Sequence, residues 1–320
     1  MTAALRPVIA SAFCALSALV PLRGQEPAVE SFLKDRTYSQ IDGEDLKLDL
    51  ALPANFATGS PLPAVVYFHG GGWQAGRRQD AYEQIKFLAS KGFVGITVSY
   101  RFAPQYKWPA QVHDAKTAVR FVRTHAAEFN IDPDRIAAAG DSAGGYLALM
   151  LGLTAPDDEL EGPGEWSEAS SRVQAVVSYY SVADFTKLKS NRPPKELTPE
   201  EAKRQAAAEA ITQAYYKKSG AQVIEDWTGT LDPADPIWKQ LSPVNYVSRG
   251  DSPVLIIQGD ADPVVSVDQA RQLNRTLTAA GVPHDMLIIE GGGHGFTRPQ
   301  AARANAKMLE FLRLTLAPPK

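Results

Sequence analysis

The chain has 320 residues, of which 44% are hydrophobic, and a formal net charge of −3 at pH 7. A chain of this length can form one large α/β domain or two small ones, and its hydrophobic content is ordinary for a globular protein. Because the charge is small and no basic stripe is visible, the sequence gives no reason to expect a nucleic-acid partner.

The first 24 residues differ from the rest of the chain. Arg6 precedes an apolar run over residues 8–20, and Gly24 closes the segment. This pattern predicts a signal peptide over residues 1–24 and a secreted or periplasmic domain over residues 25–320. The apolar run is too short to cross a bilayer comfortably, so we expect no stable membrane span; an uncleaved N-terminal anchor is the alternative.

The only cysteine, Cys14, lies inside this segment. Cleavage near Gly24 would therefore leave a chain without disulfides, a thiol nucleophile or cysteine-ligated metal sites. No other metal cluster or cofactor motif is visible, so we expect no cofactor.

The domain begins with strands. Residues 25–36 read as an exposed lead-in, and residues 37–41 and 46–52 read as the two strands of a hairpin around Asp42–Gly43. The second strand alternates leucines with other side chains, which is typical of a strand with one apolar face. Antiparallel strands ahead of parallel ones predict a mixed sheet.

Apolar runs then alternate with helical patterns along most of the chain. This alternation predicts an α/β fold, in which helices cover both faces of a mostly parallel sheet. The expected strands cover residues 63–68, 93–99, 136–139, 173–179, 253–258 and 286–289, and the expected helices cover 80–91, 110–128, 146–153, 266–280 and 299–316. Asp132-Pro133-Asp134 reads as a turn.

One insertion interrupts the alternation. Residues 186–241 are polar at their start and contain a helical pattern over 199–217, followed by Trp227 and Trp238. We expect this segment to form a cap over the carboxyl edge of the sheet, where α/β proteins bind their ligands. At least one of the two tryptophans is expected to line the pocket, and the alternative is that both anchor the cap to the domain.

The motif Gly140-Asp141-Ser142-Ala143-Gly144 lies between an apolar strand and a helical pattern. A strand that turns sharply into a helix needs small residues around the turning residue, and the two glycines provide that clearance. Ser142 would then stand exposed at the tip of the turn, beside the first N–H groups of the next helix. This arrangement favours a nucleophilic serine.

Two later loops offer the partners that such a serine needs. Asp260 and Asp262 follow one expected strand, and His294 lies in a glycine-rich loop after the next one. Because the carboxyl ends of parallel strands share one edge, both loops should lie near Ser142. We interpret His294 as the general base. We favour Asp262 as the acid that orients it, because Pro263 and the following valines would fix the loop; Asp260 remains the alternative.

The run His69-Gly70-Gly71-Gly72 follows another expected strand. Its backbone N–H groups, with that of Ala143, could bind the oxyanion of a tetrahedral intermediate. A rival interpretation is a dinucleotide fingerprint, but the strand that should end in an acidic residue ends instead in Ser99-Tyr100-Arg101.

Together these residues resemble the α/β-hydrolase superfamily, in particular hormone-sensitive-lipase-like esterases of the bifunctional acetylxylan/feruloyl esterase branch. The likeness extends over residues 40–316 and includes the blocks at 99–114, 132–145, 262–265 and 293–296. It implies Ser142, Asp262 and His294 as the triad and Gly71, Gly72 and Ala143 as oxyanion donors. Two features depart from the family pattern: Ser266 stands where proline is usual, and the 186–241 insertion is longer than in minimal members.

The resemblance implies a secreted serine carboxylesterase that acts on short acyl or aryl esters, such as acetyl or feruloyl groups on plant polysaccharide. An arylformamidase-type hydrolase shares the same oxyanion loop and triad and is one alternative. A non-catalytic binding protein on a hydrolase fold is another, although such proteins usually lack a member of the triad.

Overall fold

The computed structural model describes residues 29–318 apart from 55, 58 and 189–197. The expected signal peptide, residues 1–24, lies outside these described residues. Eight strands form one sheet in the order β1-β2-β4-β3-β5-β6-β7-β8. The strands are β1 (Val29–Ile41), β2 (Glu44–Pro53), β3 (Leu62–Phe68), β4 (Val94–Val98), β5 (Ile131–Asp141), β6 (Ala175–Tyr179), β7 (Val254–Gly259) and β8 (His284–Ile289).

The sheet is mixed, as the sequence predicts. Strand β2 pairs antiparallel with β1 and β4, and every other neighbouring pair is parallel. The β1–β2 hairpin turns at Asp42 and Gly43, whose φ angles of 52° and 81° are both positive. Positive φ angles at both central residues are typical of a type I′ turn, whose twist matches that of the two strands of a hairpin.

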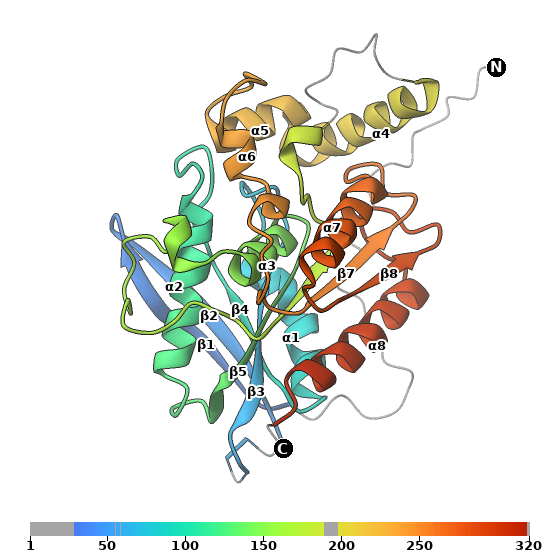
Figure 1. The fold of residues 1–320 in the computed structure, drawn as a ribbon. Coiled ribbons are helices and arrows are strands. Elements are labelled where there is room, and N and C mark those ends of the chain that lie inside the picture. Colours follow the sequence, from blue (N-terminus) through green and yellow to red (C-terminus); the bar gives the residue numbers. More distant parts are fainter. Residues whose placement is uncertain (1–28, 55, 58, 189–197, 319–320) are drawn as a thin grey trace, which may run out of the picture.

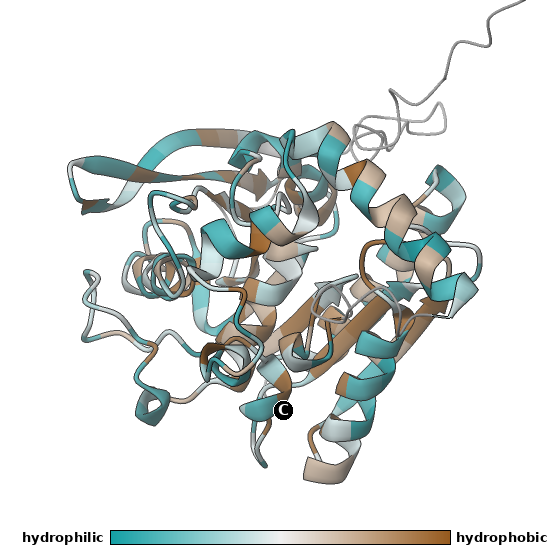
Figure 2. Cartoon of the chain, turned by 90° about the horizontal axis from the view of Figure 1, so that it is seen from above, coloured by the Kyte–Doolittle hydropathy of each residue, from teal (hydrophilic) through white to brown (hydrophobic). Residues whose placement is uncertain are grey.

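Helices cover both faces of the sheet (Figure 1). The helices of the core domain are α1 (Tyr82–Ala89), α2 (Ala110–Thr124), α3 (Ala143–Leu153), α7 (Val267–Ala280) and α8 (Arg298–Thr315). Apolar side chains of α2, α3 and α7 pack on one face, and those of α1 and α8 pack on the other. Along β3, Val66 and Phe68 belong to the first core, whereas Val65 and Tyr67 belong to the second. The central parallel strands are therefore apolar on both sides and read in the sequence as continuous apolar runs, whereas the β1–β2 hairpin is more polar. In Figure 2, hydrophobic colouring accordingly runs along strands inside the sheet.

Two sequence-based boundaries are wrong. Residues 29–36 are not a lead-in but the first part of β1, which pairs with β2, although residues 34–36 are exposed as expected. Register shifts and a positive φ of 57° at Asp35 interrupt the alternation that would have revealed this strand. Strand β5 likewise starts at Ile131 rather than at residue 136, because the expected turn is a bulge within the strand.

The segment between β6 and β7 folds into α4 (Pro199–Tyr216), α5 (Gly220–Thr228) and the short α6 (Ile237–Gln240). These helices lie together beyond one end of the sheet (Figure 1). Several hydrogen bonds connect this cap to loops that follow parallel strands. Among them, Gln74 Nε2 donates to the carbonyl of Val223, and Arg204 donates to Ser266 Oγ. The cap therefore lies over the carboxyl edge of the sheet. Within the described ranges, no helix is long and apolar enough to cross a membrane.

Candidate active site

Ser142 occupies the sharp turn between β5 and α3. Its φ of 51° and ψ of −117° lie in a region that residues with side chains rarely adopt, and such strain is characteristic of functional sites. Its N–H donates to the carbonyl of Tyr179 over 2.9 Å, which holds the turn against β6. Gly144 is required nearby, because a Cβ there would lie only 2.0 Å from the carbonyl oxygen of Phe68.

The structure brings Ser142, His294 and Asp262 together in a chain of hydrogen bonds. His294 Nε2 lies 2.9 Å from Ser142 Oγ, and His294 Nδ1 lies 2.9 Å from Asp262 Oδ2. A proton on Nδ1 that is held by the carboxylate leaves Nε2 free to accept the proton of the serine hydroxyl. This is the geometry that activates a serine as a nucleophile.

Asp262 is held in place by its own partners. The residue is only 1% exposed, and its Oδ1 accepts hydrogen bonds from the backbone N–H groups of Val264 and Val265. Oδ2, the oxygen that faces His294, also accepts from Gln258 Nε2 over 3.1 Å. These bonds fix the carboxylate at the position where it can orient the imidazole ring.

Asp260 lies elsewhere in the same loop. Its side chain is exposed, and its Oδ1 accepts a hydrogen bond of 2.7 Å from the N–H of Gly291. It therefore acts as a turn residue that joins the ends of β7 and β8. Of the two carboxylates that the sequence left open, only Asp262 contacts His294.

Tyr180 packs against the histidine and was not found by the sequence analysis. Its ring meets the His294 ring edge to face, with centroids 5.0 Å apart. Tyr180 is buried and has a positive φ of 36°, so the chain is strained where β6 ends beside the histidine. The only sequence signal was a tyrosine pair at the end of an apolar strand.

The glycine loop after β3 begins beside Ser142, since a Cβ on Gly70 would lie 3.3 Å from Ser142 Cβ. Gly71 and Gly72 have φ angles of 128° and 58°, and a Cβ on Gly71 would lie 2.0 Å from the carbonyl oxygen of Ala75. Among the described residues, the N–H groups of Gly71, Gly72 and Ala143 have no hydrogen-bond partner. Ala143 is the first residue of α3, where an N–H lacks a partner within the helix. Three unpaired N–H groups near a nucleophile can stabilise a developing oxyanion.

His69 shapes this loop. Its Nδ1 donates to the carbonyl of Gly70 over 2.7 Å, and its ring stacks on Tyr100, whose hydroxyl donates to the His69 carbonyl. Burial lowers the pKa of His69 to about 4, so its ring is neutral near neutral pH. His69 is therefore a structural hydrogen-bond donor.

Asp141, next to the nucleophile, is a second residue that the sequence analysis did not assign. Tyr67 donates a hydrogen bond of 3.2 Å to its Oδ1, and its Oδ2 lies 2.5 Å from the position of a Cβ on Gly70. Burial raises the pKa of Asp141 to about 6. Its carboxyl group thus packs between the start of the glycine loop and the turn that carries Ser142.

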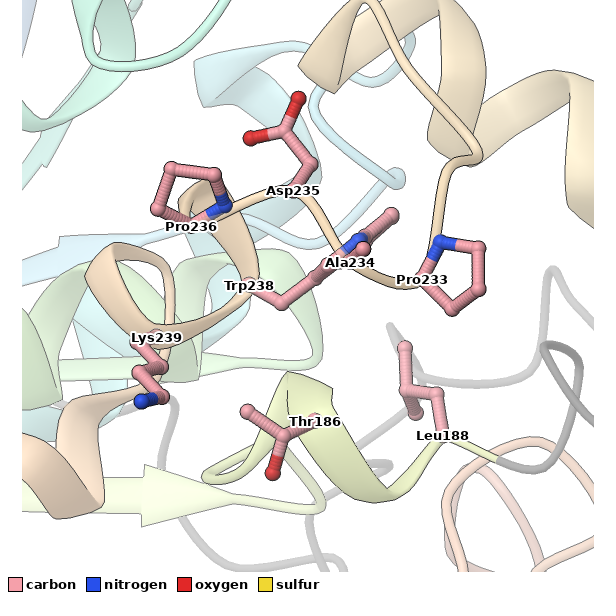
Figure 3. Close-up of a pocket in the computed structure, with 8 residues that line it drawn as sticks. All are labelled: Thr186, Leu188, Pro233, Ala234, Asp235, Pro236, Trp238 and Lys239. Carbon is pink, nitrogen blue, oxygen red and sulfur yellow. The ribbon is translucent and has the colours of Figure 1, made fainter.

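The two tryptophans of the cap differ in their surroundings. Trp227 is fully buried, stacks on Trp73 of the glycine loop and donates through Nε1 to Gln111 Oε1. It anchors the cap to the glycine loop. Trp238 borders a separate hollow of about 400 Å³ between the chain after β6 and the start of α6 (Figure 3). None of the triad residues borders that hollow, whose lining residues are Thr186, Leu188, Pro233, Ala234, Asp235, Pro236, Trp238 and Lys239.

A mostly parallel sheet with a serine at a strand-to-helix turn, followed in the chain by Asp262 and His294, defines an α/β-hydrolase. More narrowly, the chain belongs to the BD-FAE family, whose model matches residues 48–277. The resemblance on which the sequence-based expectations relied is therefore confirmed.

Known relatives agree with this placement. The chain is 32% identical to Esterase LipC of Mycobacterium tuberculosis over 246 residues, which cover 76% of this chain and 55% of LipC. It thus spans about half the length of that curated relative. A propionate-bound esterase of Thermogutta terrifontis superposes with a TM-score of 0.70 at 28% identity, covering 90% of this chain and 97% of the other. A truncated carbohydrate esterase from gut microbiota superposes with a TM-score of 0.69 at 25% identity, covering 92% and 99%.

Proposed function

We propose that this protein is a serine carboxylic ester hydrolase. The observation that carries the proposal is the chain of two 2.9 Å contacts from Ser142 through His294 to Asp262, beside three unpaired backbone N–H groups. The esterase names of a relative and of structural neighbours support the same reaction class.

In the first half of the proposed reaction, Ser142 Oγ attacks the carbonyl carbon of the ester while His294 Nε2 takes the hydroxyl proton. The carbonyl oxygen becomes an oxyanion, which the N–H groups of Gly71, Gly72 and Ala143 stabilise. When the intermediate collapses, the bond to the alcohol oxygen breaks and His294 gives that oxygen the proton. The alcohol leaves, and the acyl group stays on Ser142.

In the second half, water replaces the alcohol. His294 takes a proton from the water as its oxygen attacks the acyl carbon, and the second oxyanion is held by the same N–H groups. Collapse breaks the bond to Ser142 Oγ, which regains its proton from His294. The net change is one ester and one water converted to one acid and one alcohol.

The direct test is turnover of p-nitrophenyl acetate by the wild-type protein and by Ser142→Ala. The variant should lose about 10⁴-fold or more in kcat, because only the attacking oxygen is removed. Ser90→Ala is a suitable control, because Ser90 lies at the end of α1 and its hydroxyl donates only to the carbonyl of Phe87. Wild-type protein without turnover, or Ser142→Ala with wild-type turnover, would overturn the proposal.

For the substrate, we propose short-chain acyl or aryl esters, in particular acetyl or feruloyl groups on plant polysaccharide. Support comes from the family match, from the propionate bound to the Thermogutta terrifontis esterase and from the carbohydrate esterase among the structural neighbours. Rates on p-nitrophenyl esters of rising chain length, methyl ferulate and acetylated xylan would test this. Turnover of N-formylkynurenine but of none of these esters would instead identify an arylformamidase.

We also propose that the protein is exported, on the strength of Arg6 and the apolar run over residues 8–20. Expression of the full chain in a bacterial host, followed by N-terminal sequencing of the product outside the cytoplasm, should find cleavage near Gly24. A full-length product retained in the cytoplasm would contradict export.

A further inference from the structure

The last residue of the cap helix α4 reaches the glycine loop. A Cβ placed on Gly72 would lie 2.6 Å from the hydroxyl oxygen of Tyr216 and 3.0 Å from its Cζ atom. The phenol end of Tyr216 therefore packs directly on the α-carbon of Gly72, whose N–H is one of the proposed oxyanion donors.

Hydrogen bonds on either side of Tyr216 set its position. Arg204, three turns earlier in α4, donates to Ser266 Oγ in the loop beyond Asp262, so the helix is attached near the acid of the triad. After α4, the Val223 carbonyl accepts from Gln74 in the glycine loop. Helix α4 thus spans the site from the aspartate loop to the glycine loop. Ser266, which departs from the family pattern, supplies the contact at one end.

The Tyr216 hydroxyl is suited to donate a hydrogen bond. Its pKa is raised above the usual value, mainly by burial and to a smaller extent by the nearby Tyr215 and Asp141. The hydroxyl therefore keeps its proton at any working pH. Among the residues that the structure describes, no hydrogen bond to this hydroxyl is seen, and none contributes to its raised pKa. A donor that is partly removed from water and lacks a partner is costly, and a bound ligand can supply the missing acceptor.

We propose that Tyr216 is a catalytic residue supplied by the cap, whose hydroxyl donates a hydrogen bond to the carbonyl oxygen of the bound ester beside the N–H of Gly72. This inference rests on the proposed ester hydrolysis. Since the acceptor gains negative charge as Ser142 attacks, the bond strengthens in the transition state and lowers the barrier to reaction. The cap would then complete the oxyanion site in addition to covering it.

Tyr216→Phe tests the proposal, because it removes the hydroxyl and keeps the ring. We expect kcat and kcat/KM to fall together by about 10-fold to 100-fold, with KM nearly unchanged, on both p-nitrophenyl acetate and p-nitrophenyl butyrate. A trifluoromethyl ketone provides a second measurement, since addition of Ser142 to its carbonyl places an oxyanion at the same position. Its inhibition constant should rise by the same factor as kcat/KM falls.

Tyr215→Phe is the matched control, because Tyr215 is the preceding residue, is 41% exposed and packs on Tyr216 through its ring. It should leave both measurements unchanged, and the melting temperature of each variant should match the wild type. Tyr216→Phe with wild-type kcat, or with a change in KM alone and unaltered ketone binding, would overturn the role of Tyr216 while leaving the esterase proposal intact. Failure of the wild type to hydrolyse either ester would overturn both.

Discussion

The indole rings of Trp73 and Trp227 stack face to face, with their centroids 3.6 Å apart and their planes 3° from parallel. Trp73 directly follows the glycine run that carries two of the proposed oxyanion donors, and Trp227 belongs to helix α5 of the cap. The cap and the glycine loop are therefore packed as one unit, and a substitution in the cap should alter the position of the loop.

Trp227→Ala should lower the free energy of unfolding by about 3–5 kcal/mol, because it leaves a cavity where a fully buried ring stood. It should also lower kcat, since Trp73 loses the surface that fixes the glycine loop. Urea unfolding and p-nitrophenyl acetate turnover measure the two effects. Trp238→Ala serves as the comparison. Its ring donates to the Asp232 carbonyl within the cap and borders a hollow that no glycine-loop residue lines, so its removal should affect stability alone. Wild-type kcat in a folded Trp227→Ala protein would show that the loop is held independently of the cap.

Asp262→Asn should reduce kcat by about 10³-fold to 10⁴-fold, because an amide cannot hold His294 in the tautomer that accepts the serine proton. Asp260→Asn, in the same loop, should retain most of its activity, since Asp260 contacts the N–H of Gly291 rather than the imidazole. Steady-state kinetics of the two variants side by side make the comparison. A larger loss of activity in Asp260→Asn than in Asp262→Asn would identify Asp260 as the acid that orients His294.

The sequence was sufficient for the features that local chemistry determines. The turn at Ser142 needs glycine at 140 and 144, where a Cβ would lie within 2.5 Å of backbone atoms. The motif can therefore be recognised from the sequence alone. Strands buried on both faces read as continuous apolar runs, and the loops after them must share one edge of the sheet. For these reasons Ser142, Asp262 and His294 could be singled out although 152 residues separate the first from the last.

The sequence was insufficient where a role depends on a contact that no local pattern encodes. Tyr180 and Asp141 matter because of the ring of His294 and the backbone of Gly70, which lie far from them in the chain. Tyr216 ends a helix with almost no amphipathic pattern, so nothing marked the side that faces Gly72. The bulged first half of β1 was missed for a related reason, since its register shifts remove the regular alternation.

Activity should fall when the solution is changed from mildly alkaline to mildly acidic, because a doubly protonated His294 ring cannot accept the proton of Ser142. Protonation also removes the acceptor from the 2.9 Å contact between Nε2 and Ser142 Oγ. The dependence of kcat/KM on pH, measured with p-nitrophenyl acetate, would show this fall. A rate that stays flat over this range, under conditions where acylation limits turnover, would argue against a histidine base.

Asp141 should make stability depend on pH in a defined direction. Burial raises its pKa from the ordinary 3.8 to about 6 in the folded protein, so on raising the pH the unfolded chain loses this proton first. The proton on Asp141 therefore stabilises the folded state fully below about pH 4, and this contribution to the free energy of unfolding is lost as the pH rises through about 6. A shift of about two pKa units corresponds to about 3 kcal/mol at most.

Asp141→Asn removes this titration and retains the shape of the side chain. Between pH 4 and pH 7, the free energy of unfolding of the variant should rise relative to the wild type by about 1–3 kcal/mol. Every other titrating group is common to both proteins, so the pH dependence of the difference in their free energies of unfolding reports Asp141 alone. The substitution also alters the contact with Tyr67, whose contribution should be nearly constant with pH. Urea unfolding of both proteins at four pH values gives the comparison. A difference that does not change over this range would mean that Asp141 is ionised in the folded protein as readily as in the unfolded chain.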